Sequence, residues 1–97
     1  MVLDAEIYLQ ARKMGVPEHT IDAIERFFED GLRPGGFLES VIDNDLRGAI
    51  KRADPSNKIA LEVIVDWFNM YVPSVLWGYS GACQHYIKAK RNIMEIT

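Results

Sequence analysis

The chain has 97 residues, of which 48% are hydrophobic and 26% charged, with a single cysteine and a formal net charge of −3. These values fit one globular domain and exclude a disordered chain, a disulfide scaffold and a collagen-like repeat. The first residues do not form a basic segment followed by an apolar one, and no apolar run approaches the ~18 residues of a membrane span. We therefore expect a cytoplasmic protein, not a membrane protein, with one domain over residues 1–97.

The spacing of apolar residues predicts α-helices almost throughout, and loop-forming residues divide them into about five short helices. The first helix is expected over residues 2–14. A second is expected between Pro17 and Gly31, because proline suits the first turn of a helix and glycine suits the residue after its end. Two glycines and a proline then predict a loop over residues 32–36. The predicted fold class is all-α.

A third helix is predicted to begin near Phe37. Its core-facing stripe is broad and consists of Phe37, Leu38, Val41, Ile42, Leu46, Ala49 and Ile50. Asp45 falls near the centre of this stripe, where an unpaired carboxylate would be costly, so it needs a partner. The candidates are Arg52, two turns later, and the free N–H groups at the start of another helix. We predict a structural role for both residues.

The fourth helix, predicted over residues 55–71, is the apolar centre around which the others pack, with Ile64 and Trp67 in the middle. Asp54 is well placed as its N-cap, with Pro55 at the first helical position. The residues left for solvent are Lys58, Glu62, Asp66 and Asn69. A helix this apolar is expected to be surrounded by its neighbours, or partly by a second subunit.

The segment after Pro73 concentrates apolar bulk in a loop flanked by glycine. The residues concerned are Val75, Leu76, Trp77 and Tyr79. Two interpretations stay open: these side chains close the core, or they form an exposed patch that mediates a homodimer or a contact with a host protein. A last helix is predicted over residues 82–95. Its inward residues are expected to be Ala82, Cys83, Tyr86, Ile87, Ile93 and Met94.

Charge is distributed unevenly along the chain, because residues 1–46 carry a net charge of −6 and residues 47–97 a net charge of +3. The second helix carries the sharpest feature, four acidic residues at spacings of four, three and four that share one helix face: Glu18, Asp22, Glu25 and Glu29. Like charges at this spacing repel each other. The face is either a docking surface for a basic partner or a solvated outer face. Asp30, Glu39 and Asp43 would extend it if the third helix lies alongside.

Part of the chain resembles a family of small, largely uncharacterised proteins encoded by tailed bacteriophages and prophages. The resemblance covers roughly residues 17–78. It rests on Pro34-Gly35-Gly36-Phe37-Leu38, Asn44-Asp45-Leu46, Arg52-Ala53-Asp54, Asn57 and Trp77-Gly78. It implies a viral origin, expression in the cytoplasm of a bacterial host and no known enzymatic role. The chain departs from the family at Tyr79, where related proteins usually have serine.

Residue sets that would support catalysis or cofactor binding are missing from the sequence. Cys83 and His85 point about 200° apart on a helix, so they do not form a nucleophile and base. Two histidines and one cysteine, far apart, do not make a zinc site. Gly35-Gly36 lacks the spacing and the lysine of a phosphate-binding loop. An acidic domain is also a poor sequence-specific binder of nucleic acid. We predict no enzyme activity, no cofactor and no metal.

The leading functional hypothesis is a phage accessory protein that binds a host protein through the acidic helix face. The partner would be a host defence complex or a complex that handles nucleic acid, which the protein would inhibit. The alternative is a structural or assembly role, in which the apolar patch at Val75, Leu76, Trp77 and Tyr79 mediates self-association.

Overall fold

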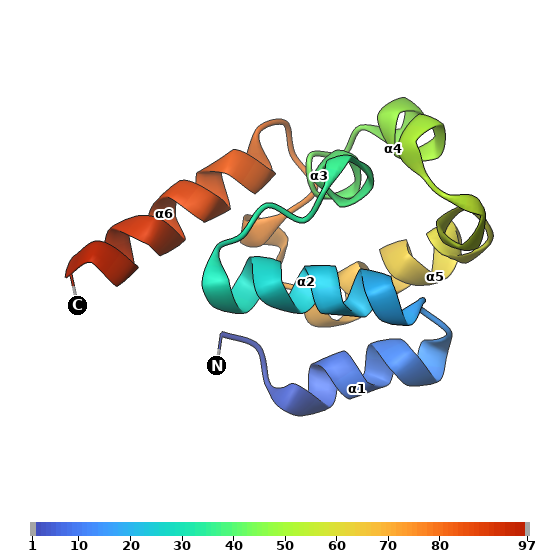
Figure 1. The fold of residues 1–97 in the computed structure, drawn as a ribbon, viewed down its shortest axis with the longest axis horizontal. Helices are drawn as coiled ribbons and strands as arrows, with labels where there is room; N and C mark the ends of the chain where they lie inside the picture. Colours follow the sequence, from blue (N-terminus) through green and yellow to red (C-terminus); the bar gives the residue numbers. More distant parts are fainter. Residues whose placement is uncertain (1, 97) are drawn as a thin grey trace.

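Six α-helices and one short 3₁₀ segment make up residues 2–96, the part of the chain that the computed structural model describes, with side chains described to residue 94 (Figure 1). They are α1 (Ala5–Met14), α2 (Glu18–Asp30), α3 (Gly36–Ile42), α4 (Leu46–Arg52), α5 (Pro55–Tyr71), η1 (Ser74–Leu76) and α6 (Ala82–Ile96). The prediction of an all-α fold is confirmed, with six helices in one compact globule where about five were expected. Among the described helices, none has the length and apolarity needed to cross a bilayer.

Helix boundaries follow the capping residues. Asp54 accepts a hydrogen bond from the backbone N–H of Asn57 at 2.8 Å, with Pro55 in the first turn, so the predicted start of α5 is confirmed. Asp4 caps α1 in the same way. At the other ends, α1 and α2 both stop at a glycine in the left-handed region, Gly15 with φ 98° and Gly31 with φ 68°.

The core forms where α1, α2 and α5 meet (Figure 1). Trp67 of α5 is completely buried, and its indole Nε1 donates a hydrogen bond to the carbonyl oxygen of Ile7 in α1 at 2.9 Å. Phe28 of α2 and Phe68 of α5 are also fully buried, with their ring centroids 6.2 Å apart. The placement of α5 at the centre, with Ile64 and Trp67 buried, is confirmed.

The prediction that α5 exposes only its polar residues was wrong. Two of its apolar side chains lie at the surface, Ile59 at 87% exposed and Met70 at 64% exposed.

The predicted third helix is interrupted, and this changes which of its residues are buried. Asn44 adopts a left-handed conformation with φ 61°, and the chain restarts as α4 after a turn at residues 43–45. The interruption rotates two members of the second half of the stripe out of the core, leaving Leu46 64% exposed and Ile50 47% exposed, while Ala49 stays buried. The expectation that Leu46 and Ile50 face the core was therefore wrong.

Helix α6 packs on the molecule through its first half and extends away from it through its second half (Figure 1). Ala82, Cys83 and Ile87 are buried, as predicted. Tyr86 is half-buried and donates its hydroxyl hydrogen bond to the carbonyl oxygen of Phe28 at 2.5 Å. The inward placement predicted for Ile93 and Met94 was wrong, since both side chains are exposed.

Candidate functional site

The acidic face of α2 is partly neutralised by groups from its own chain. At its N-terminal end, Glu18 forms an ion pair with Arg12 of α1, in which the guanidinium Nε donates to the carboxylate at 3.0 Å. Both side chains are exposed, so the pair contributes little to stability. Because of this pair, however, Glu18 is not an isolated negative charge, unlike what was predicted for the four carboxylates of this face.

At the C-terminal end of α2, the carboxylate of Glu29 is more fully engaged. It accepts hydrogen bonds from the backbone N–H groups of Val2 at 2.7 Å and Leu3 at 3.1 Å, and from the hydroxyl of Tyr8 at 2.6 Å. Partial burial acts to raise the pKa of Glu29, but these hydrogen bonds outweigh burial and leave the pKa lowered. Burial and the neighbouring Glu29 raise the pKa of Tyr8. Glu29 therefore holds the start of the chain against α2.

Two of the three predicted extensions of the acidic face, Glu39 and Asp43, lie on and just after α3 and also have partners within the chain. Glu39 receives two hydrogen bonds from Arg33, at 2.8 and 3.1 Å. Asp43 accepts the backbone N–H of Cys83 at 2.8 Å and so caps the start of α6. Both carboxylates have local structural partners.

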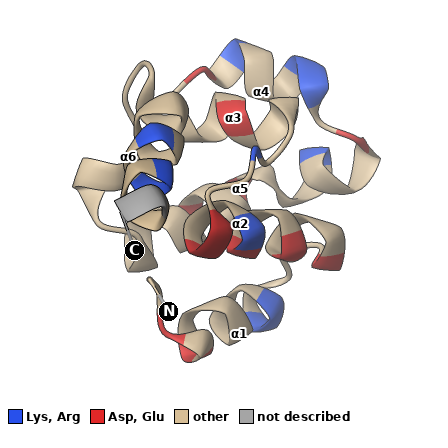
Figure 2. Ribbon diagram, turned by 60° about the vertical axis from the view of Figure 1, so that its left-hand side comes forward, with Lys and Arg blue, Asp and Glu red and all other residues tan. Residues whose placement is uncertain are grey.

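The middle of the face keeps its negative charge. Among the described residues, Asp22, Glu25 and Asp30 have no hydrogen-bond or ion-pair partner on their side chains, and all three are exposed. Together with Arg26 and Glu29 they line a shallow concavity of about 440 Å³. Figure 2 shows acidic residues along α2 with one basic residue among them. This arrangement suits a cationic side chain presented by a partner.

A larger groove of about 680 Å³ lies between the α3–α4 hairpin, α5 and the segment after it. Its apolar walls consist of Val41, Leu46, Ala49, Leu61, Val65, Val72, Trp77 and Tyr79. Its polar lining residues include Asn44 and Asn69, and among the described residues that line it Asp45 alone is charged. Sequence reasoning missed the groove. The signal that would have found it is the Asn44-Asp45 pair, which favours a turn followed by an N-cap.

Of the predicted self-association residues, Trp77 and Tyr79 line this groove, and the four residues differ in burial. Val75 is 74% exposed, and the Tyr79 side chain lies at the surface, where its hydroxyl is 2.9 Å from the Nδ1 atom of His85. Leu76 and Trp77 are partly buried against the core, and the Trp77 ring contacts Phe68 with centroids 4.9 Å apart. The segment therefore closes the core on one side, with Leu76 and Trp77, and exposes apolar surface on the other, at Val75.

Of the three residues given a structural polar role, Asp45 and Asp54 cap the starts of α4 and α5, and Arg52 lies at the end of α4. Asp45 caps α4 by accepting the backbone N–H of Gly48 at 3.1 Å, which is the helix-start partner predicted for it. Arg52, the other candidate partner, lies 3.9 Å from the Asp45 carboxylate and donates to the hydroxyl of Ser40 at 3.1 Å. The prediction that Asp45 lies in a buried stripe was wrong, since the turn before α4 leaves it exposed.

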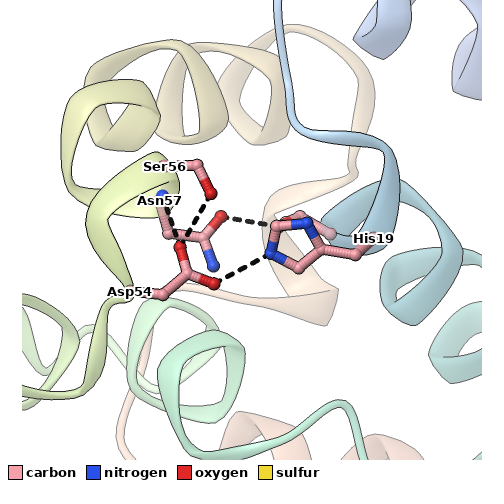
Figure 3. A network of polar contacts seen from close by, with 5 residues as sticks. His19, Asp54, Ser56 and Asn57 are labelled. Carbon is pink, nitrogen blue, oxygen red and sulfur yellow. Dashed lines mark hydrogen bonds and ion pairs between the residues drawn. The ribbon is translucent and has the colours of Figure 1, made fainter.

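The starts of α2 and α5 are joined by a polar network that the sequence did not reveal (Figure 3). His19 contacts the Asp54 carboxylate at 2.9 Å, and Ser56 donates to the same carboxylate at 2.9 Å. The backbone N–H of Asn57, then the Ser56 hydroxyl, lower the pKa of Asp54. Behind this pair, the buried Thr20 hydroxyl donates to the side-chain oxygen of Asn57 at 2.6 Å. These hydrogen bonds join the start of α2 to the start of α5.

The thiol of Cys83 is buried and has the properties of a core side chain. Burial raises the pKa of the Cys83 thiol to about 12, with smaller contributions from Glu39 and Asp43, so the thiolate nucleophile does not form near neutral pH. Within residues 2–94, no three His, Cys, Asp or Glu side chains converge in a way that would hold a metal ion.

Comparison with protein-family models, with curated proteins and with solved structures finds no match for this chain. What the protein does therefore has to follow from the chemistry of its own surface.

Proposed function

We propose that this chain is a small, non-enzymatic binding protein that docks a basic partner on the acidic face of α2. The observation that carries the proposal is the set of exposed carboxylates left without a partner in the described structure, Asp22, Glu25 and Asp30, around a shared concavity. Because these like charges repel one another and form no hydrogen bond or close ion pair among the described residues, a cationic ligand is the group that would relieve the repulsion.

The setting we propose is a bacteriophage acting inside a bacterial host. The resemblance of residues 17–78 to small phage and prophage proteins supports it. A host complex that handles nucleic acid is the partner class that fits best, since such proteins carry basic grooves that an acidic surface can occupy. Occupying that groove would inhibit the complex without any chemistry by the phage protein.

The direct test is capture of a host protein by the tagged full-length chain from bacterial lysate, at low and at moderate salt. The triple variant Asp22→Asn, Glu25→Gln and Asp30→Asn removes the free carboxylates with little change in side-chain volume. We expect the wild type to retain a defined host protein that is lost with added salt and lost with the triple variant.

The matched control neutralises exposed acids on another helix, with Glu62→Gln and Asp66→Asn in α5. The control should retain the same host protein as the wild type. If the triple variant captures it equally well, the acidic face of α2 is not the docking surface.

A second candidate function is self-association, which the exposed apolar residues around the groove favour. Leu46 at 64% exposed and Tyr79 at 37% exposed line the groove, and Val75, which follows the lining residue Ser74, is 74% exposed. The test is sedimentation of the wild type and of Val75→Asp over a range of concentrations. A mass above 11.1 kDa that rises with concentration, and falls in the variant, supports assembly. A monomer at every concentration contradicts it.

A further inference from the structure

The first residues of the chain form a strap, residues 2–4, that lies against the end of α2 before α1 begins. Leu3 is its anchor, with only 6% of its surface exposed. Figure 1 shows the N-terminus close to the C-terminal end of α2. The strap is therefore held by one apolar side chain and by the hydrogen bonds that its backbone makes.

The two hydrogen bonds that the strap donates from its backbone, at Val2 and Leu3, both end on one carboxylate. Glu29 accepts the N–H of Val2 on one oxygen, and on the other it accepts both the N–H of Leu3 and the hydroxyl of Tyr8. Three of the lone-pair positions that a carboxylate offers are thus used by the chain itself. Guanidinium and ammonium groups need these same positions for a bidentate or close contact.

Glu29 also lines the concavity formed with Asp22, Glu25 and Asp30. A docked cation would therefore bind the same carboxylate, that of Glu29, as the strap does. At this edge of the concavity, N–H groups of the strap already donate hydrogen bonds to Glu29.

We propose that the strap is an autoinhibitory contact, which occupies Glu29 in the free protein and is displaced when a basic partner binds the concavity. This inference rests on the proposed function. The apparent affinity for the partner is then reduced by the fraction of molecules whose strap is closed, and any change that loosens the strap should tighten binding.

The test uses the full-length chain, with oligolysine as the cationic probe at low ionic strength. Leu3→Ala removes the apolar anchor of the strap and leaves every carboxylate of the concavity in place. Tyr8→Phe is a second loosening variant, which removes only the hydroxyl that Glu29 accepts. We expect both variants to bind oligolysine severalfold more tightly than the wild type.

The matched control is Val16→Ala, which trims a buried apolar side chain in the loop at the opposite end of α2. It should bind oligolysine as the wild type does. Amide hydrogen exchange supplies a readout that packing alone would not move: saturating oligolysine should speed exchange at the N–H of Leu3 in the wild type.

The outcomes separate the two proposals. Equal affinities for wild type, Leu3→Ala and Tyr8→Phe, with binding still lost in the triple carboxylate variant, overturn the autoinhibitory strap and leave the proposed function standing. Unchanged protection of the Leu3 amide in the complex also overturns the strap. If none of the proteins binds oligolysine, both the docking face and its inhibition are overturned.

Discussion

Helices α1, α2 and α5 form one region of the molecule, and the α3–α4 hairpin forms a second. The two regions differ in how they bury apolar residues that recur at helical spacing. In the first region the core-facing side of α5 is buried from Ala60 to Phe68, and the rings of Phe28, Trp67 and Phe68 are excluded from solvent. In the second region the same spacing runs from Val41 to Ile50, yet Leu46 and Ile50 are largely exposed and only the small Ala49 among the later members is buried.

The difference comes from backbone continuity and not from hydrophobicity. Helix α5 runs unbroken from its cap at Asp54, so each turn returns the same face to the core. Between α3 and α4, the left-handed Asn44 and the cap at Asp45 start a new helix in a new direction. Apolar periodicity therefore predicts burial only as far as the helix continues.

The largest expected effect breaks the first region at its centre. Trp67→Ala should lower the free energy of unfolding by about 3–5 kcal/mol, because it leaves a cavity and removes the donor to the Ile7 carbonyl. Urea unfolding followed by circular dichroism measures this loss. Trp77→Ala is the control, since Trp77 is only partly buried, and it should cost clearly less. Equal losses would contradict the central role of Trp67.

A smaller effect is expected where α2 and α5 are joined by polar groups. Thr20→Val keeps the side-chain shape and removes the hydroxyl that donates to Asn57, leaving a buried oxygen without a partner. The expected loss is about 1–3 kcal/mol in the free energy of unfolding, measured in the same way. Ser56→Ala is the control, because Ser56 is exposed and should change stability less.

Much of the first region could be predicted from the sequence, because its signals are local. The glycine ends of α1 and α2 and the Asp54-Pro55 start of α5 each depend on a few adjacent residues. The break after α3 was also encoded locally, at Asn44-Asp45, but a continuous apolar stripe concealed it. Apolar periodicity predicts one continuous helix there, whereas Asn44 and Asp45 favour a turn and a new helix start. The structure has the turn.

The candidate site was predictable only in part, because the partners of its carboxylates come from distant segments. The spacing of Glu18, Asp22, Glu25 and Glu29 was enough to place them on one helix. Nothing in that spacing could indicate that residues 2 and 3 would return to bind Glu29, 26 and 27 positions away in sequence. Helical spacing identifies a charged face, and tertiary contacts decide which of its charges remain free.

The Glu29 contact also predicts a dependence on pH at the edge of the first region. Its lowered pKa means that Glu29 stabilises the fold above the pKa of the unfolded chain, about 4.3, and that this contribution is lost as pH falls through the folded pKa. Glu29→Gln should therefore be less stable than the wild type at neutral pH, with the difference narrowing in acid. Unfolding of the wild type and of Glu29→Gln measured from pH 7 to pH 3 checks this, and a difference that stays constant over that range would contradict it.

The smallest expected effect belongs to the second region and sharpens the contrast between the two. If Leu46 contributes nothing to the core, Leu46→Gln should change the free energy of unfolding by no more than about 0.5 kcal/mol, as for other exposed sites. Ile42→Ala, four residues earlier on the same stripe but fully enclosed, should cost about 2–5 kcal/mol. A large loss for Leu46→Gln would mean that α3 and α4 pack as one helix in solution, and the turn at Asn44 would then not set the limit of the core.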